Sequence, residues 1–175
     1  VTNIVALRGD PPEGNDDFTP PPDGFAHANE LVTHIRKIQP SDAPFGVAVA
    51  GYPEKHLQAE SLETDLANLK LKVDADADII ITQLFYNNDS FLRFRDQAQK
   101  AGITIPIVPG LMPIQSAGQI QRITSMCGAT IPDDLQTQLD GAIDDDERAE
   151  QIGIEQCVAQ TSELLASGVP GIHLY

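Results

Sequence analysis

Five short runs of β-branched and apolar residues, each ending abruptly in polar, glycine or proline residues, constrain the fold of this chain. The runs span residues 3–10, 45–53, 78–86, 104–110 and 170–175. Segments with helical periodicity separate them, and we expect helices over about 28–38, 61–75, 91–101, 117–127, 132–139 and 146–166. Apolar strands that alternate with helices are typical of a parallel sheet covered by helices, so the sequence predicts an α/β fold.

The strand and helix pattern fits two architectures. One is a TIM-type (βα)8 barrel, here incomplete with five parallel strands, and the other is an open doubly wound sheet. The chain begins and ends in strand residues, which would leave strand edges unpaired, so we expect residues 1–175 to be a single partial domain. In both architectures ligands bind at the carboxyl ends of the strands, where polar residues are therefore the first candidates for chemistry.

Composition excludes several classes of protein. With 41% hydrophobic residues among 175, the chain can form a core, and 26 acidic against 11 basic residues give a net charge of −15. This balance argues against nucleic-acid or anionic-membrane partners. Two cysteines without a Cys-x-x-Cys pairing, and no long apolar span, predict a cytoplasmic protein. The four scattered histidines and the lack of any ligand motif predict no metal, and no glycine-rich dinucleotide fingerprint is present.

Arg8, Gly9 and Asp10 end the first run. Glycine lets a ligand approach the backbone, arginine can bind a phosphate with two nitrogen atoms, and the carboxylate can bind a polarised heterocycle or act as a base. The alternative is a turn with an exposed Arg–Asp pair.

Tyr52 and His56 follow the second run. An aromatic ring and an imidazole four residues later could flank a planar cofactor or its phosphate. The alternative is a capped loop in which Lys55 and His56 are solvated.

The helix expected over 61–75 begins at Ser61, a good N-cap, and carries an apolar face. Beside that face, Asp65, Asn68 and Lys72 form a second line along the helix. This line would border the mouth of a barrel, although many amphipathic helices carry such a stripe for solubility alone.

Gln83 directly follows three isoleucines and a threonine at 79–82, where a buried strand should continue with apolar residues. A buried amide needs partners for its donors and its acceptor. A heterocyclic ring that presents both kinds of group would satisfy it.

Seven segments together resemble 5,10-methylenetetrahydrofolate reductase along the whole chain, in the order and spacing of that family. They are Leu7–Pro12, Val49–His56, Asp65–Ala75, Ile81–Tyr86, Phe91–Arg95, Pro106–Gly110 and Gly171–Tyr175. The Gly-Tyr-Pro and Ile-Thr-Gln-Leu-Phe segments are closer to the eukaryotic-type members of the family.

The resemblance implies a (βα)8 barrel that binds FAD and uses NAD(P)H to reduce 5,10-methylenetetrahydrofolate to 5-methyltetrahydrofolate, in one-carbon metabolism and methionine synthesis. It also implies a homo-oligomer. Matched residue by residue, the family's FAD contacts are Arg8, Gly9, Asp10, Ala28, Tyr52, His56, Ala59, Asp65, Asn68 and Lys72. The implied folate contacts are Asp10, Gln83, Gln119 and Tyr175.

The resemblance gives Asp10 a catalytic role, because an ionised carboxylate near the N1–C2 edge of the flavin would lower its reduction potential. The family's first three strands have no counterpart in residues 1–175, and the glutamate that protonates the folate lies there. Asp76 and Leu174 also depart from the family pattern. We therefore expect a C-terminal part of the flavin barrel that is inactive alone.

Two other functions remain open from the residues. One is a module that binds a flavin or a folate without turnover. The other is a different βα-barrel enzyme, with a phosphate-bearing substrate and no flavin.

Overall fold

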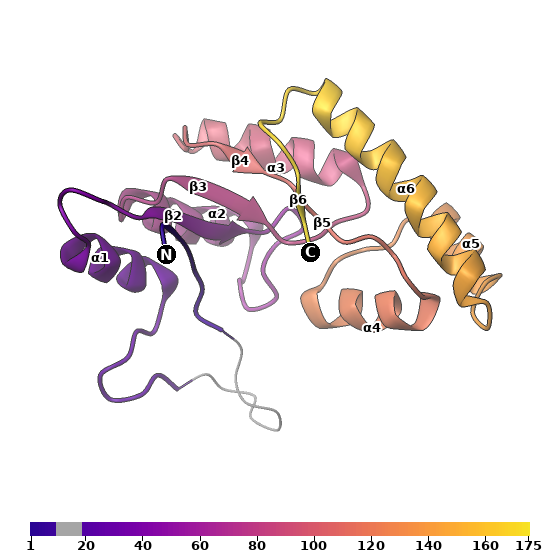
Figure 1. The fold of residues 1–175 in the computed structure, drawn as a ribbon, viewed down its shortest axis with the longest axis horizontal. Coiled ribbons are helices and arrows are strands. Elements are labelled where there is room, and N and C mark those ends of the chain that lie inside the picture. Colours follow the sequence, from indigo (N-terminus) through magenta and orange to yellow (C-terminus); the bar gives the residue numbers. More distant parts are fainter. Residues whose placement is uncertain (10–18) are drawn as a thin grey trace.

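The computed structural model describes residues 1–9 and 19–175. Among these residues, four parallel strands form one sheet in chain order: β1 (Asn3–Ala6), β2 (Gly46–Gly51), β3 (Ile79–Thr82) and β4 (Ile107–Val108). A second parallel pair follows, made of β5 (Gly110–Leu111) and β6 (His173–Leu174). The helices in Figure 1 are α1 (Ala28–Ile38), α2 (Leu62–Asp74), α3 (Asn88–Lys100), α4 (Ala117–Cys127), α5 (Asp133–Asp140) and α6 (Asp146–Ala166).

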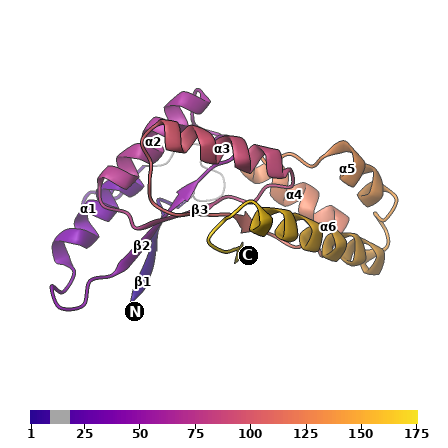
Figure 2. The ribbon, with the colours of Figure 1, turned by 90° about the horizontal axis from the view of Figure 1, so that it is seen from above.

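The order of the strands separates the two architectures. Strand β1 pairs with β2, β2 with β3 and β3 with β4, and a helix connects the two strands of each pair. Helices α1, α2 and α3 lie along one side of the sheet in Figure 2. A doubly wound sheet would reverse its strand order and carry helices on both faces. The predicted incomplete (βα)8 barrel is therefore confirmed, and the doubly wound alternative is wrong.

The fourth apolar run forms two strands instead of the one predicted over 104–110. Pro109 lies between β4 and β5 and has no N–H to give to a ladder. Its carbonyl accepts a hydrogen bond from His173 N–H at 2.9 Å, and the carbonyl of Leu111 accepts one from Tyr175 N–H at 3.0 Å. The chain thus changes its pairing partner at this proline, from β3 to β6.

The core beneath the sheet is built from the inner faces of the first three helices. Val32 of α1, Leu69 of α2 and Phe94 of α3 are almost fully buried in one cluster with the strand residues Val49 and Ile80. This packing holds the carboxyl ends of β1, β2 and β3 at one edge of the sheet.

A second cluster packs the last three helices together. It contains Ile120 of α4, Leu135 of α5 and Ile152 of α6, together with Leu84 and Tyr86 from the segment after β3. The segment that contains Gln83 therefore lies between the two clusters.

The helix boundaries follow from the caps. The Ser61 hydroxyl accepts the Thr64 N–H at 3.1 Å, which confirms Ser61 as the cap of α2. Helix α3 begins at Asn88, three residues before the predicted start at 91. The Asn87 side chain accepts the N–H of Asp89 at 2.9 Å, so this cap starts the helix before its first apolar residue.

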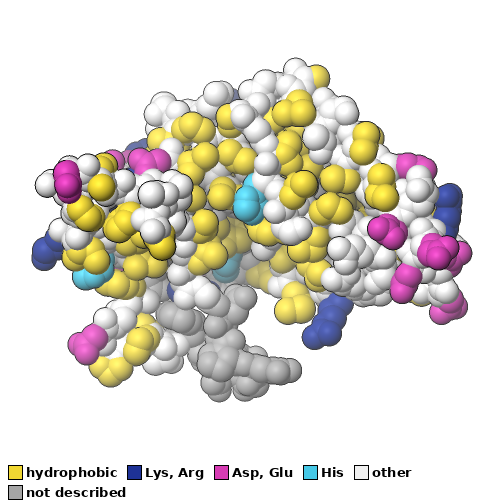
Figure 3. Space-filling view, in the orientation of Figure 1, with side chains coloured by type: hydrophobic (Ala, Val, Ile, Leu, Met, Phe, Trp, Pro, Cys, Tyr) yellow, Lys and Arg dark blue, Asp and Glu magenta, His cyan; other side chains and the backbone are white. Residues whose placement is uncertain are grey.

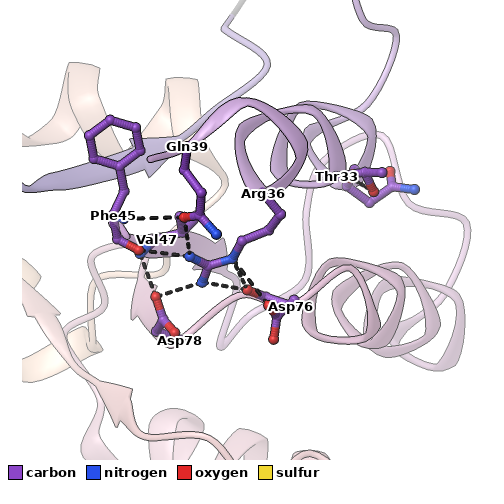
Figure 4. A network of polar contacts seen from close by, with 8 residues as sticks. Thr33, Arg36, Gln39, Phe45, Val47, Asp76 and Asp78 are labelled. Carbon is purple, nitrogen blue, oxygen red and sulfur yellow. Dashed lines mark hydrogen bonds and ion pairs between the residues drawn. The ribbon is translucent and has the colours of Figure 1, made fainter. Parts of the chain in front are cut away.

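Arg36 connects α1 to the amino ends of the strands (Figure 4). Its guanidinium donates to the carbonyls of Asp76 (2.6 Å) and Phe45 (2.7 Å) and to the carboxylate of Asp78 (2.7 Å). That carboxylate also accepts the N–H of Val47 at 2.6 Å. Desolvation raises the pKa of Asp78, but the Val47 hydrogen bond and the Arg36 guanidinium together hold it below its ordinary value.

The surface reflects the acidic composition. In Figure 3, acidic side chains gather over the end of the molecule that carries α5 and the start of α6. Hydrophobic side chains spread over the middle of the same face. Among the helices described here, none combines the length and the apolar character that crossing a bilayer requires.

Candidate functional site

A cavity of about 340 Å³ lies at the carboxyl ends of β1 and β2. Its walls come from these two strand ends, the start of α1, the loop after β2 and one side of α2. Eight of the ten predicted FAD contacts line it: Arg8, Ala28, Tyr52, His56, Ala59, Asp65, Asn68 and Lys72. Residues that are far apart in the sequence thus surround one hollow, at the place where a parallel sheet binds its ligands.

The other two predicted FAD contacts lie elsewhere. Gly9 follows the cavity residue Arg8 but does not line the cavity itself. Its φ of 80° lies in the left-handed region, which glycine adopts without strain. Asp10 lies outside the described residues.

The loop after β2 is held by its own side chains. The ammonium of Lys55 donates to the carbonyls of His56 (3.1 Å) and Ala59 (2.6 Å). The buried carboxylate of Asp65 accepts the N–H of His56 at 3.0 Å. Lys55 is therefore tied into the loop, and the interpretation of Lys55 as a solvated side chain is wrong.

His56 has a defined orientation in this loop. Its Nδ1 accepts the N–H of Gln58 at 3.1 Å, so in the neutral ring the proton is on Nε2. The ring packs edge-on against Tyr52, with 4.6 Å between the ring centroids. The side chain of Gln58 also accepts a hydrogen bond from Arg8 at 2.7 Å, and so connects the ends of β1 and β2.

Lys72 gives the cavity a cation with an unusual pKa. Its ammonium donates to the carbonyl of Ala50 at 2.6 Å and lies 5.7 Å from the centroid of the Tyr52 ring. Burial lowers the pKa of Lys72 to about 8, and the nearby charge of Asp65 opposes part of that change. Together, Lys72 and Arg8 suit the cavity to an anionic group such as a phosphate.

A second cavity, of about 210 Å³, contains two of the predicted folate contacts. Gln119 from the first turn of α4 and Tyr175 after β6 both line it. The hydroxyl of Tyr175 donates to the carbonyl of Thr82 at 2.8 Å, so this side chain also joins the last strand to β3.

Gln83 lies at neither of these two cavities. It borders a much smaller hollow that it shares with Tyr52, Glu54 and Cys127. Its side-chain oxygen accepts the N–H of the next residue, Leu84, at 2.9 Å. Gln83 and Tyr52 therefore lie beside the same small hollow. Asp10, which is also a predicted folate contact, lies outside the described residues.

Sequence reasoning missed some of the residues in the larger cavity. Asn29, Gln58 and Leu71 line it as well. Asn29 belongs to the first turn of α1, and Leu71 lies beside Lys72 on α2. The side chain of Gln58 binds Arg8, which is 50 positions away in the sequence, so no local sequence pattern identifies Gln58 as a site residue.

No group of three or more His, Cys, Asp or Glu side chains that could hold a metal ion occurs within residues 1–9 and 19–175. His173 is partly buried in β6 and packs edge-on against Tyr175, with ring centroids 4.8 Å apart. His173 therefore packs as a strand residue.

The strand order and the cavity at the strand ends define part of a barrel of the βα class, with a polar site at the carboxyl face. The comparison with protein families gives the particular family. Residues 1–175 match the family described as methylenetetrahydrofolate reductase, and the chain belongs to this family.

Two of the relatives are similar in sequence to this chain along its whole length. It is 45% identical over 184 residues to methylenetetrahydrofolate reductase (NADH) 1 of Zea mays, covering 100% of this chain and 31% of the relative. It is 38% identical over 175 residues to 5,10-methylenetetrahydrofolate reductase of Escherichia coli, covering 100% of this chain and 56% of that relative. The chain thus spans about a third of the plant relative and just over half of the bacterial one.

A solved structure supports the fold. An uncharacterized protein from Clostridium thermocellum, described as binding two copies of 5-methyl-5,6,7,8-tetrahydrofolic acid, superposes with a TM-score of 0.55. It covers 84% of this chain and 50% of its own, at 16% sequence identity. At that identity the likeness concerns the architecture alone.

Proposed function

We propose that this chain is the C-terminal part of a flavin-binding catalytic barrel that reduces 5,10-methylenetetrahydrofolate to 5-methyltetrahydrofolate with NAD(P)H. The observation that carries the proposal is the gathering of eight predicted FAD contacts around one cavity at the strand ends. Membership of the family supports the reaction, and the name of the maize relative favours NADH as the donor.

The residues of the 340 Å³ cavity fit FAD in chemical character. Lys72 and Arg8 can supply positive charge to the two phosphates, and Tyr52 and His56 bring an aromatic ring and an imidazole to the cavity wall. Asp65 holds the His56 main chain and sustains the charge of Lys72. When bound, FAD supplies hydride transfer between the nicotinamide donor and the folate.

The folate would lie on the side of Tyr52 that Gln83 borders. Gln83 would bind the pterin ring through its amide, which requires its bond to Leu84 to be shared or replaced. Gln119 and Tyr175 would contact the folate further along, from the second cavity. Asp10 would hold the pterin and lower the flavin potential, so Asp10→Asn should raise the midpoint potential. Cytoplasmic location and assembly into a homo-oligomer remain predictions.

The test uses the protein at its full natural length. It should be purified with bound FAD, visible as flavin absorbance, and should form 5-methyltetrahydrofolate from NADH and methylenetetrahydrofolate. Lys72→Met should weaken FAD binding by about tenfold. The matched control is Lys70→Met on the same helix, where the side chain pairs with Asp74 outside the cavity.

Three outcomes contradict the proposal in different ways. A colourless, fully folded protein that gains no absorbance with added FAD would favour a barrel enzyme without a flavin. A yellow protein that binds folate and gives no product would favour a binding module. Equal FAD affinity in Lys72→Met and Lys70→Met would show that Lys72 does not contribute to FAD binding.

A further inference from the structure

Glu54 joins three separate elements beside the small hollow that contains Gln83 and Tyr52. It lies in the loop after β2, and its carboxylate is partly buried. One oxygen accepts a hydrogen bond from the Ser90 hydroxyl at 3.2 Å, in the first turn of α3. The other accepts the N–H of Thr130 at 2.8 Å, just beyond the end of α4.

The two ends of this bridge differ in rigidity. Ser90 is 7% exposed and precedes Phe91, which is fully buried in the core. Its hydroxyl also accepts a hydrogen bond from Arg93 at 3.2 Å. The α3 end is therefore fixed, and Thr130, which is exposed, is the end that Glu54 holds in place.

A second contact falls at the same end of α4. Gly128 ends the helix with a φ of 73°, and a Cβ at this position would lie 2.5 Å from a methyl carbon of Leu57. The loop after β2 and the end of α4 thus meet at two points, Glu54 with Thr130 and Leu57 with Gly128. In Figure 1 the end of α4 lies beside this loop.

Helix α4 transmits this attachment to the folate side. Its opposite end carries Gln119, which lines the second cavity, and its buried face is fixed by Ile120 and Thr124. A change in the position of residues 127–130 would therefore tilt Gln119. It would also move the wall that faces Gln83.

The flavin side has attachments that do not involve Glu54. Lys55 bonds within its own loop, Asp65 holds His56, and Lys72 holds Ala50. Loss of the Glu54 carboxylate should therefore loosen residues 127–130 at the end of α4 and leave the 340 Å³ cavity in place.

From this asymmetry we propose that Glu54 is a positioning residue for the folate site, acting through α4 and the wall opposite Gln83. The inference rests on the proposed function, because it assumes that folate occupies the side of Gln83 and Gln119. It assigns to Glu54 no contact with either ligand.

The experiment measures two affinities in the flavin-loaded protein at full length. Glu54→Ala should weaken binding of 5-methyltetrahydrofolate by about tenfold and change FAD affinity less than twofold. Glu54→Gln should restore folate affinity to within about threefold of wild type, because its amide oxygen can accept from Thr130 and its NH₂ can donate to Ser90. The control is Asp145→Ala, which removes a carboxylate that accepts the Arg148 N–H at the cap of α6 and should leave both affinities unchanged.

A second measurement needs no variant. Saturating 5-methyltetrahydrofolate should slow hydrogen exchange at the Thr130 amide at least threefold in the wild type, since positioning and binding are reciprocal. Unchanged folate affinity in Glu54→Ala, or equal losses for folate and FAD, would overturn the inference. A hydrogen-exchange rate at the Thr130 amide that does not change when the ligand binds would also overturn it. A wild type that binds neither ligand would instead overturn the proposed function, and this inference with it.

Discussion

The Nζ of Lys72 donates to the main-chain oxygen of Ala50 across 2.6 Å, and so fastens α2 to the end of strand β2 just before Tyr52. Because this ammonium is buried, its pKa is lowered to about 8. The charge that the cavity offers to an anionic ligand can therefore be changed within an accessible pH range.

The affinity for FAD should fall as the pH rises through 8. A phosphate beside Lys72 favours the charged lysine, and above its pKa of about 8 the free protein must take up a proton to bind. We expect a loss of roughly tenfold between about pH 7.5 and 9.5, measured by fluorescence titration. Lys72→Met should bind weakly with little pH dependence, and Lys70→Met should behave like the wild type; a pH profile retained in Lys72→Met would contradict the assignment.

Stability should rise over part of the same pH range. The pKa of Lys72 is about 8 in the folded chain, against 10.5 for an unperturbed lysine, so the unfolded chain binds more protons between these values. The free energy of unfolding should therefore increase with pH in this window, by at most about 3 kcal/mol. Urea denaturation of the ligand-free protein checks this, and Lys72→Met should remove the increase.

Removing the charge of Asp65 should shift the midpoint of the FAD pH profile. Asp65 raises the pKa of Lys72 against the effect of burial, so Asp65→Asn should move the midpoint below 8. The amide oxygen of asparagine can still accept the His56 N–H, which preserves the loop. A midpoint that moves upward, or stays in place, would show that Asp65 does not act on Lys72.

Gly110→Ala should be strongly destabilising. A Cβ at Gly110 would overlap the Thr82 carbonyl oxygen and lie 2.7 Å from the Tyr175 ring. We expect a loss of about 2–4 kcal/mol in the free energy of unfolding. Gly118→Ala in α4 is the matched control, because nothing lies within 4 Å of its added methyl group, and it should gain about 0.5–1 kcal/mol. Chemical denaturation compares the two, and similar values would contradict the packing around Gly110.

Arg36→Ala should destabilise the fold without changing FAD affinity. Its guanidinium holds the carbonyls of Phe45 and Asp76 and the carboxylate of Asp78, at the end of the strands opposite the cavity. We expect a loss of about 2–4 kcal/mol, measured by urea denaturation, with Arg36→Lys only partly restoring it.

The dependence of the free energy of unfolding on acid pH provides a control for the role of Arg36. The pKa of Asp78 is lowered in the folded chain, so its contribution is present above the ordinary carboxyl pKa and is lost as the pH falls through the lowered value. In Arg36→Ala this acid-dependent loss should shrink. An unchanged dependence on acid pH would show that Arg36 does not set the Asp78 pKa.

The parts of the fold that the sequence predicted well are those with strong local signals. The sequence predicts Ser61 as a cap because its hydroxyl and the Thr64 N–H are three residues apart. Helical spacing predicts the line of Asp65, Asn68 and Lys72, although only the fold shows that this line faces a cavity. The predicted start of α3 is late because Asn88 and Ser90 are buried polar residues, which periodicity assigns to the surface.

The features that the sequence did not predict depend on contacts between residues that are far apart in the chain. The pairing change at Pro109 depends on His173, 64 positions later, and the role of Gln58 depends on Arg8. Glu54 carries no local sign that its carboxylate bridges Ser90 and Thr130. The sequence predicted which residue types are present at the strand ends, but tertiary packing decides which of them face each other.

The interruption at Pro109 has a consequence for how the four-stranded sheet is joined to the β5–β6 pair. Between β3 and β5, Gly110 N–H donates to the Thr82 side-chain hydroxyl at 2.9 Å, and the Tyr175 hydroxyl donates to the Thr82 carbonyl. Two hydroxyl groups thus substitute there for main-chain rungs. The junction between these two sheets therefore depends on single oxygen atoms, which substitutions can remove one at a time while the backbone stays the same.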